Sequence, residues 1–578
     1  PGNNVESVVI PDVKDFSTKT NDEKLTSVNR RWIEPEVDEQ VVGELARQIE
    51  LPIPFLSVLY NRGLHDAEKI ERFLRPRLSD LSDPFRLPNM GVAVTRIWDA
   101  IDAGEPIVVF GDYDVDGISA TSLHLSFFGK IGAQAEVYIP HRQEEGYGLN
   151  DAAIQKLASH HVKVLVTADC GTTSHKEIAL ARSLGIDVIV TDHHQLQEEV
   201  PEPYAFLNPY RPDSLYPFKG LCSGGLAYKV AKAYSMKYPT FETFPTEQLD
   251  LVALSSIADV VPLRDENRLF VREGLRQITE GTRSGIRALK QILGITGSCS
   301  ASTIGFQLAP VINAAGRLAH ADLGVRLLTK ASDAEALVIA KKLERLNWAR
   351  RKIEQDIFEE AKALVNKDKD SPVIVVGKHG WHMGVVGIVA SRLVECFHRP
   401  AIVVAFNEGG LGKGSARSVP GYNVYEALAQ CQECLVGFGG HPSAAGVTVT
   451  FTEFPNFQAK MYEAVRTNIS GECKAPVLDI DAEVSLSELS HQLLRELEQL
   501  NPFGMGNPEP LLSSIGVRVL QKRIVGNNHL KLVIRQNGSV PIECIGFRMG
   551  EWFDKLGGER ALFDVAFTPE INRWKGCD

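Results

Sequence analysis

Pro106-Ile-Val-Val-Phe110 is followed at once by Gly111-Asp-Tyr-Asp-Val-Asp-Gly117, and this stretch decides the fold class. The short apolar run predicts a buried strand, and the glycines that bracket the acids predict a tight loop. Three carboxylates within five residues repel one another unless cations lie among them. Oxygen ligands at this density suit Mg²⁺ or Mn²⁺ better than a soft metal. A solvated acidic turn or an isolated Ca²⁺ loop is the alternative, although no Glu follows where an EF-hand requires one.

Two further apolar runs also lead into acids or histidines. Val162-Lys-Val-Leu-Val-Thr-Ala-Asp169 continues into Asp169-Cys-Gly171, and Asp187-Val-Ile-Val-Thr-Asp192 continues into Asp192-His-His194. Helical segments lie between these runs, which predicts a parallel sheet with crossover helices. In such sheets the ligand site lies outside the carboxyl ends of the strands. The sequence therefore predicts one site at that edge, and Leu251-Val-Ala-Leu-Ser-Ser-Ile-Ala-Asp259 is a later apolar segment that closes on an acid.

Composition and charge narrow the classes of protein. The 578 residues are 44% hydrophobic and 23% charged, which is ordinary for a soluble globular protein and long enough for three or four domains. No apolar run approaches the ~20 residues of a membrane-spanning helix and no signal segment opens the chain, so we expect a cytoplasmic protein with no membrane partner. The net charge of −11 means that any nucleic-acid site must be a local groove.

The nine cysteines are scattered, which suits a reducing compartment better than a disulfide framework. Cys431 and Cys434 form one C-x-x-C, with His441 downstream. A structural zinc site would need a second pair of ligands nearby, so cysteines on a helix face are the favoured interpretation.

The sequence pattern divides the chain into successive parts. Residues 1–30 are polar and predict a mobile arm, and residues 31–88 have helical periodicity. Residues 89–331 contain the strand–helix repeats of a first α/β domain. Residues 332–368 lack Gly and Pro and predict one long connecting helix. Residues 369–470 predict a second α/β domain.

Residues 471–578 change to short strands with turn signals between them. The expected strands are residues 477–480, 515–520, 531–534, 544–547 and 564–567. Five short strands in about one hundred residues predict a small β-barrel, with an OB-fold as the leading candidate.

The predicted connecting helix, residues 332–368, carries four cations: Arg345, Arg350, Arg351 and Lys352. They could face a nucleic acid, although a charged helix face in solvent is the default interpretation.

Two glycine-rich segments of the second α/β domain are candidate anion sites. Gly412-Lys-Gly-Ser-Ala-Arg-Ser418 combines flexible backbone N–H groups, two hydroxyls and an Arg, as an anion nest does, although a plain β-turn fits equally well. It is not a P-loop, since Lys413 precedes a Gly. Gly439-Gly-His-Pro-Ser-Ala-Ala-Gly446 places His441 on a turn at the expected start of a helix, where a single His is more often structural.

The pair His193-His194 makes the predicted site specific. Neutral imidazoles beside several carboxylates complete a nitrogen and oxygen site that suits Mn²⁺. Asp169 arrives on a neighbouring strand and is placed to bridge two ions, which together activate water and stabilise an in-line displacement at phosphorus. The candidate reaction is hydrolysis of a phosphate ester or anhydride. Arg317 and Arg417 would neutralise the charge of the phosphate.

Eight motifs resemble those of one protein family. Four are similar to the motifs of the DHH phosphoesterase superfamily: Gly111–Gly117, Thr167-Ala-Asp-Cys-Gly171, Asp192-His-His194 and Ala258-Asp-Val-Val-Pro262. Four more resemble those of one branch, the RecJ single-strand-specific 5′→3′ exonucleases: Asn313-Ala-Ala-Gly-Arg-Leu318, Trp381-His-Met-Gly-Val-Val-Gly-Ile388, Gly414-Ser-Ala-Arg-Ser418 and Gly439-Gly-His441. The resemblance runs from about Arg31 to the end of the chain.

The resemblance implies two α/β domains, DHH and DHHA1, that face each other across a cleft and are joined by a long helix, with a C-terminal OB-fold β-barrel. It implies an enzyme that hydrolyses single-stranded DNA 5′→3′ to 5′-mononucleotides in DNA repair and recombination. Two divalent cations, Mn²⁺ or Mg²⁺, are the implied cofactors. A single-strand-binding protein and a helicase are implied partners, and we expect a monomer.

The family's functional residues carry over onto the matching positions. The implied metal ligands are Asp114, Asp116, Asp169, His193 and Asp259. Asp169 would bridge the ions, His194 would orient or protonate near the scissile phosphate, and the role of Asp112 stays open. The implied phosphate- and substrate-binding residues are Arg317, Arg142, Tyr147, His382, Ser415, Arg417 and His441. Tyr147 would stack on a terminal base, with ordinary packing as the alternative.

The chain departs from the family pattern at its end. It stops at Trp574-Lys-Gly-Cys-Asp578, where the family continues for about one more strand. We therefore expect the last strand of the barrel to be missing and DNA holding by that domain to be affected.

Two other functions stay open. A DHH phosphodiesterase of short oligonucleotides or cyclic dinucleotides is one, but such relatives are typically shorter and lack the barrel predicted here. A non-catalytic replication scaffold of the same fold is the other, but it should have lost some acids. All five predicted ligands and both histidines are present in this chain.

Overall fold

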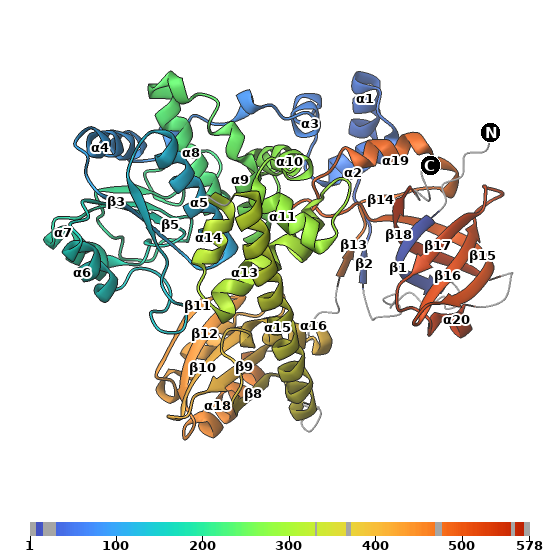
Figure 1. Ribbon diagram of the computed structural model, residues 1–578. Coiled ribbons are helices and arrows are strands. Elements are labelled where there is room, and N and C mark those ends of the chain that lie inside the picture. Colours follow the sequence, from blue (N-terminus) through green and yellow to red (C-terminus); the bar gives the residue numbers. More distant parts are fainter. Residues whose placement is uncertain are drawn as a thin grey trace. The chain divides into compact units, whose positions relative to one another are not determined.

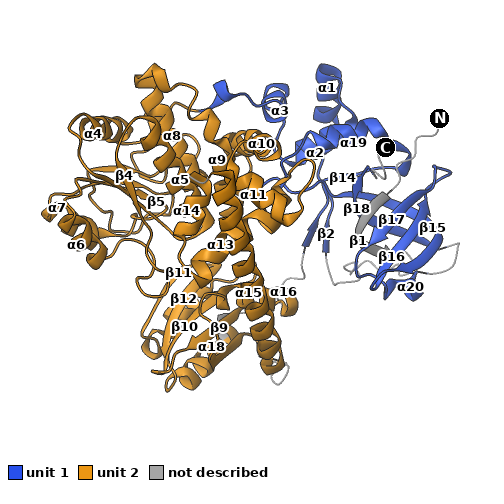
Figure 2. Cartoon of the chain, viewed as in Figure 1, with its two compact units in different colours: residues 1–81, 472–578 blue, residues 82–471 orange. Residues whose placement is uncertain are grey.

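The computed structural model describes residues 7–15, 31–329, 332–365, 371–468, 477–556 and 561–571. The chain forms two units, one made of residues 82–471 and the other of residues 1–81 together with residues 472–578 (Figure 2). Each unit has its own hydrophobic core. Among the described helices, none is both long enough and apolar enough to cross a membrane.

A parallel sheet with the strand order β4-β3-β5-β6-β7 forms the centre of the first α/β domain. Its strands are Ala135–Tyr138 (β4), Ile107–Gly111 (β3), Val164–Ala168 (β5), Asp187–Thr191 (β6) and Ala205–Leu207 (β7). Every residue of β3 and β5 is buried, as their continuous apolar runs predict. The predicted parallel sheet is therefore confirmed.

Helices cover both faces of this sheet (Figure 1). On one face, α6 (Asp151–Ser159) and α7 (His175–Ser183) pack through Ile154 and Ile178 onto Leu165 and Val188. The other face carries α4 (Met90–Asp102), α5 (Val115–Lys130) and α8 (Ser223–Lys237). Further helices complete the domain: α9 (Leu249–Ala258), α10 (Asp265–Glu280), α11 (Ser284–Leu293), α13 (Ala309–Leu318) and α14 (Asp322–Thr329).

One long helix, α15 (Asp333–Val365), follows as the sequence predicts. Residues 366–368 of the expected helix lie outside the described residues. Arg350 is buried and forms an ion pair with Glu354 at 2.6 Å, so the expectation that it faces a nucleic acid or solvent is wrong. The other three cations of that stretch are exposed.

The second α/β domain contains a mixed sheet in the order β11-β12-β10-β9-β8. Its strands are Gly437–His441 (β11), Ala444–Thr450 (β12), Leu411–Arg417 (β10), Ala401–Phe406 (β9) and Ile374–His379 (β8). Alternate residues of β9 face opposite sides. Val404 packs on the side of α17 (Val424–Ala429) and α18 (Phe454–Asn468), and Val403 packs on the side of α15 and α16 (Val386–Phe397).

Both glycine-rich segments of this domain are strands, so the interpretations as a turn and as the start of a helix are wrong. The segment around Ser415 is β10, which pairs along its length with β9 and β12. The segment around His441 is a hairpin of β11 and β12. Gly has a low strand propensity, but ladder hydrogen bonds to well-formed neighbouring strands override this local preference.

The other unit contains a closed ring of strand pairings, β15-β16-β17-β1-β18, in which β18 pairs back with β15. Its strands are Leu512–Val525 (β15), His529–Arg535 (β16), Ile542–Gly546 (β17), Ser7–Asp15 (β1) and Leu562–Glu570 (β18), with Ala482–Glu483 (β14) at the edge of β15. This ring confirms the predicted barrel. We expect the last strand of the barrel to be missing at the end of the chain. Residues 572–578 lie outside the described residues, so this stays a prediction.

The strands of the ring differ from the predicted set in one member. Val477–Asp479 (β13) pairs with Arg31–Ile33 (β2) outside the ring, and β1 takes its place between β17 and β18. The prediction of a mobile arm is therefore wrong for residues 7–15. Residues 1–6 and 16–30 lie outside the described residues.

Helices of the N-terminal segment share a core with this barrel. They are α1 (Glu39–Ile49), α2 (Ile53–Asn61) and α3 (Ala67–Leu74), and two more helices come from the C-terminal segment, α19 (His491–Glu498) and α20 (Trp552–Lys555). Phe55 and Leu59 join Leu497 and Leu512 in one buried cluster. Residues 31–81 and the C-terminal barrel are thus packed together, although the sequence treats them as separate segments.

Candidate metal centre and phosphate-binding pocket

Five acids and two histidines from separate segments meet at the carboxyl edge of the parallel sheet. Asp112, Asp114 and Asp116 follow β3, Asp169 follows β5, the histidines follow β6, and Asp259 ends α9. They form three groups whose ligand atoms lie within 4.8 Å of one another: Asp169, His193 and His194; Asp116, His193 and Asp259; Asp112, Asp114 and Asp169. The structure therefore brings together all of the predicted ligands.

The Nε2 atom of His193 faces carboxylate oxygens without a hydrogen bond. It lies 3.2 Å from Oδ1 of Asp169 and 3.5 Å from Oδ2 of both Asp116 and Asp259, yet it is buried and unpartnered among the described residues. Burial lowers the pKa of His193, which favours the neutral imidazole that a metal ligand must be. A lone pair aimed at three carboxylates fits a divalent cation between them.

Burial and mutual repulsion raise the pKa values of the acids. Burial is the larger cause for Asp112, Asp114 and Asp169, and the charges of neighbouring carboxylates add to it. The same two causes raise the pKa of Asp259 to about 8. Oδ1 of Asp112 is also buried without a hydrogen-bond partner among the described residues. The acids therefore fit a bound pair of cations, which would offset this repulsion.

The N-terminus of α8 fixes two of the acids. Ser223 N donates to Oδ2 of Asp116 at 3.0 Å, and Gly224 N donates to Oδ1 at 3.1 Å. The hydroxyl of Ser223 donates to Oδ1 of Asp169 at 2.9 Å, and that of Ser255 on α9 donates to Asp116. A Cβ on Gly224 would lie only 2.3 Å from the Ser255 oxygen, so glycine is required there. These donors are not predicted from the sequence, in which the Ser223-Gly-Gly225 segment is their one visible signal.

Asp192 does not face the cluster but holds His194. It accepts hydrogen bonds from Nδ1 of His194 at 2.7 Å and from Thr172 N at 2.8 Å. Burial opposes protonation of His194, but the hydrogen bond and charge of Asp192, with the charges of Asp259 and Asp116, raise its pKa to about 9. Burial also opposes ionisation of Asp192, yet its hydrogen bond to His194 holds its pKa well below the usual range. The contact with Asp192 therefore favours the protonated form of His194.

Two residues of the predicted terminal-nucleotide segment border the metal centre. The hydroxyl of Tyr147 donates to the carbonyl of Asp169 at 2.9 Å, and its ring lies 5.9 Å from that of His194. The guanidinium of Arg142 lies over the ring of Tyr113 at 4.7 Å, within the acidic loop. Tyr147 is half exposed, so part of its side chain is open to a ligand.

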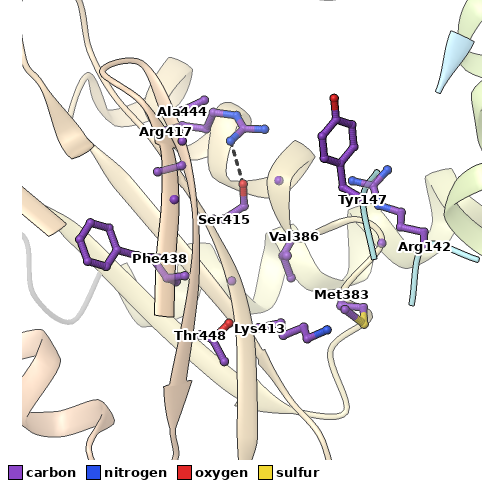
Figure 3. A pocket seen from close by; sticks show the side chains of 18 of the residues that line it. Arg142, Tyr147, Met383, Val386, Lys413, Ser415, Arg417, Phe438, Ala444 and Thr448 are labelled. Carbon is purple, nitrogen blue, oxygen red and sulfur yellow. Dashed lines mark hydrogen bonds between the residues drawn. The ribbon is translucent and has the colours of Figure 1, made fainter. Parts of the chain in front are cut away.

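A pocket of about 870 Å³ lies beside these residues, between the two α/β domains. Figure 3 shows Arg142 and Tyr147 on one side of it and Ser415 and Arg417 of β10 on the other, with a 2.7 Å hydrogen bond from Arg417 to Ser415. The first residues of α16, among them Gly387, also line it. A helix N-terminus presents free N–H groups and the positive end of the helix dipole, which suits a phosphate.

Arginines in this pocket lack acidic partners. Among the described residues, none of Arg142, Arg317 and Arg417 forms an ion pair with a carboxylate; Arg317 instead donates to the carbonyl of Gly384 at 3.0 Å. Burial, followed by the charge of Arg142, lowers the pKa of Arg317 to about 10, and the same causes lower the pKa of Arg417. Bringing such cations together is unfavourable without an anion, so the pocket suits an anionic group such as a phosphate.

Two of the predicted substrate-binding residues lie outside the lining of this pocket. His382 uses Nδ1 to accept a hydrogen bond from Gly384 N at 3.0 Å, which shapes the loop before α16. His441 is exposed at the end of β11, in the cross-strand row of Arg417 and Ala444. The structure thus brings Arg142, Tyr147, Arg317, Ser415 and Arg417 together, and leaves these two histidines at the margin.

Three family models match separate parts of the chain. The DHH family, N-terminal domain, matches residues 106–256, the DHHA1 domain matches residues 370–467, and the RecJ OB domain matches residues 480–578.

Two proteins of known family are similar to most of the chain. It is 38% identical over 550 residues to the single-stranded-DNA-specific exonuclease RecJ of Bacillus subtilis (strain 168), covering 94% of this chain and 69% of that protein. It is 35% identical over 551 residues to the protein of that name in Escherichia coli (strain K12), covering 91% and 94%.

Solved structures are similar over the same extent. The crystal structure of RecJ in complex with Mn²⁺ from Thermus thermophilus superposes with a TM-score of 0.80 at 30% identity, over 95% of this chain and 77% of that chain. The corresponding complex with Mg²⁺ gives a TM-score of 0.75 at 28% identity, over 95% and 76%.

Proposed function

Because the chain belongs to the family of RecJ single-stranded-DNA-specific exonucleases, we propose that it hydrolyses single-stranded DNA from the 5′ end and releases 5′-mononucleotides. One observation carries the proposal: the cluster of five acids and two histidines adjoins a pocket whose arginines have no acidic partners among the described residues. A divalent-cation site beside a phosphate site is the arrangement that phosphodiester hydrolysis needs.

The acids and one imidazole hold the cations in this proposal. The ligands are Asp114, Asp116, Asp169, His193 and Asp259, and Asp112 lies close enough to Asp114 and Asp169 to join them. When bound, two Mn²⁺ or Mg²⁺ ions supply positive charge at the scissile phosphate and lower the pKa of water. The bonds from Ser223 and Gly224 hold Asp116 and Asp169 in place, so little reorganisation is needed when the ions bind.

His194 acts as the acid of the reaction. Asp192 keeps it protonated, and its Nδ1 lies 3.9 Å from Oδ1 of Asp169, at the margin of the ligand cluster. Because Nδ1 is hydrogen-bonded to Asp192, His194 donates its Nε2 proton to the 3′-oxygen of the released nucleotide as the bond between that oxygen and phosphorus breaks. The charge that remains on the transferred phosphate is neutralised by Arg317 and Arg417.

The pocket holds the backbone of the single strand. Arg142 and Tyr147 receive the terminal nucleotide, with the ring of Tyr147 as a stacking surface that accepts any base. Ser415, Arg417 and the N-terminus of α16 receive phosphates. Contacts to phosphates and to the faces of bases do not distinguish one base from another, so we expect little sequence preference.

The partners and location are further parts of the proposal. A single-strand-binding protein and a helicase would supply the substrate, and the enzyme would act as a monomer in the cytoplasm. Family resemblance supports these partners.

Digestion of end-labelled single-stranded DNA tests the proposal and its need for metal. With Mn²⁺ we expect a 5′ label to appear at once in a mononucleotide, while a 3′-labelled strand shortens stepwise. EDTA should remove all activity, because uncompensated carboxylates cannot bind a phosphate, and added Mn²⁺ should restore it. A blunt duplex of the same sequence is the control. Release of dinucleotides only, or activity that survives EDTA, would contradict the proposal.

A further inference from the structure

Strand β10 presents a row of polar side chains to the pocket. Arg417, Ser415 and Lys413 alternate with residues that face the other way, of which Ala416 packs in the core against α17 and α18. Side chains at positions i, i+2 and i+4 of a strand lie on one face, roughly 7 Å apart. All three polar residues line the pocket (Figure 3).

Lys413 is the one member of this row to which the proposed function assigns no role. It is exposed, extends toward Met383, and forms no ion pair with a carboxylate among the described residues (Figure 3). None of the described residues that line the pocket is acidic. In a protein with a net charge of −11, an unpaired ammonium group in an acid-free pocket is a position for an anion.

The sheet beside Lys413 leaves room for a nucleotide. β10 pairs Lys413 with Thr448 of β12, and β11 pairs Gly437 with Thr448. A Cβ on Gly437 would meet no atom within 4 Å, so the row ends in open backbone. A hydroxyl and a flat backbone surface thus flank the ammonium group, with no bulky side chain in this row to exclude a sugar or a base.

We propose that Lys413 binds a backbone phosphate farther from the cleaved bond than the phosphate bound by Arg417. Arg417 lies at the end of the pocket next to the metal centre. There its charge acts on Arg317, as do the charges of Arg142 and Asp114. Lys413 lies four residues along the same strand, roughly 14 Å from Arg417. A single strand that follows β10 is therefore gripped at successive phosphates, and this inference rests on the proposed function.

The test compares the full-length wild type with Lys413→Gln on 5′-phosphorylated oligo(dT) of about two to ten nucleotides. The loss in kcat/KM should grow with length, reaching roughly tenfold once the substrate spans the row, because a charge-assisted hydrogen bond is lost. Binding of the longer strands, measured by fluorescence anisotropy with Ca²⁺ in place of Mn²⁺, should depend less steeply on salt. The slope of log K against log[salt] should fall by about 0.7.

Lys341→Gln is the matched control, since Lys341 is exposed on α15 and is not among the residues that line the pocket. It should leave the length dependence and the salt slope at wild-type values. An unchanged salt slope for Lys413→Gln, an equal loss at every length, or an equal effect of the control would overturn the inference. A wild type that does not hydrolyse single-stranded DNA would instead overturn the proposed function, so the two failures are distinguishable.

Discussion

Asp169→Asn is expected to lower the hydrolysis of single-stranded DNA by roughly 10³-fold or more, because Asp169 belongs to two of the three ligand groups. Asparagine removes the charge but keeps the shape. It also tolerates the left-handed backbone of Asp169, whose φ is 69°, whereas alanine would add strain. Single-stranded DNA binding should stay within a few-fold of wild type, since the arginines of the pocket are unchanged.

The measurement for this variant is single-turnover hydrolysis together with binding of the same labelled strand. Asp151→Asn is the control, because Asp151 is exposed at the start of α6 and is not a member of the acidic groups. It should leave both values near wild type. Hydrolysis that persists in Asp169→Asn would remove the bridging role, and loss of binding alone would place Asp169 in substrate recognition.

Asp192→Asn is expected to lower kcat by roughly 10²–10⁴-fold, the range that a general acid contributes. Asp192 holds Nδ1 of His194 and raises the pKa of that imidazole to about 9. Without its charge, burial dominates and the pKa falls. Bound cations would offset the charges of Asp116 and Asp259, which also raise the pKa of His194. The hydrogen bond between Asp192 and His194 would remain.

The pH profile separates this role from a structural one. His194 must be protonated to act as an acid, so activity should decline as the pH rises through its pKa. In Asp192→Asn this decline should begin at a lower pH than in the wild type, and activity should recover partly as the pH is lowered. An equal loss at every pH, with the profile unshifted, would show that Asp192 only supports the fold.

The metal centre could be predicted from the sequence because of sheet geometry. Asp116, Asp169 and His193 follow three parallel strands, and the carboxyl ends of parallel strands share one edge. For Asp259 the sequence shows only an apolar segment that closes on an acid, and its role as a ligand is implied by the family resemblance. That segment is a helix whose C-terminal end reaches the same edge. The preference for Mn²⁺ or Mg²⁺ then follows from the residue types, which are carboxylates and imidazoles.

The supports of the centre could not be predicted in the same way. Ser223 and Ser255 lie on two helices that pack against α5, and their donors reach Asp116 and Asp169 only through that packing. β1 joins the barrel with more than five hundred residues of intervening sequence. Local patterns carry no information about such contacts, since both depend on surfaces that exist only after folding.

The glycine-rich strand β10 illustrates a second limit. Its sequence favours a turn, yet the pairing of Gly414 and Ser415 with Val403, Val404 and Val447 sets the backbone. The interpretation as an anion site stays a prediction, and the structure gives it a different basis. Alternation along a strand, and not a curved nest, places Ser415 and Arg417 on the pocket face.

Anomalous diffraction from crystals grown with Mn²⁺ locates the bound cations and so tests whether Asp169 bridges a pair of them. We predict two manganese peaks at the carboxyl edge of the parallel sheet, one on each side of Asp169 and within coordination distance of its carboxylate. The remaining ligands should be Asp114, Asp116, His193 and Asp259, with Asp112 as a candidate sixth. A single peak, or peaks that Asp169 does not contact, would contradict hydrolysis by a pair of bridged cations.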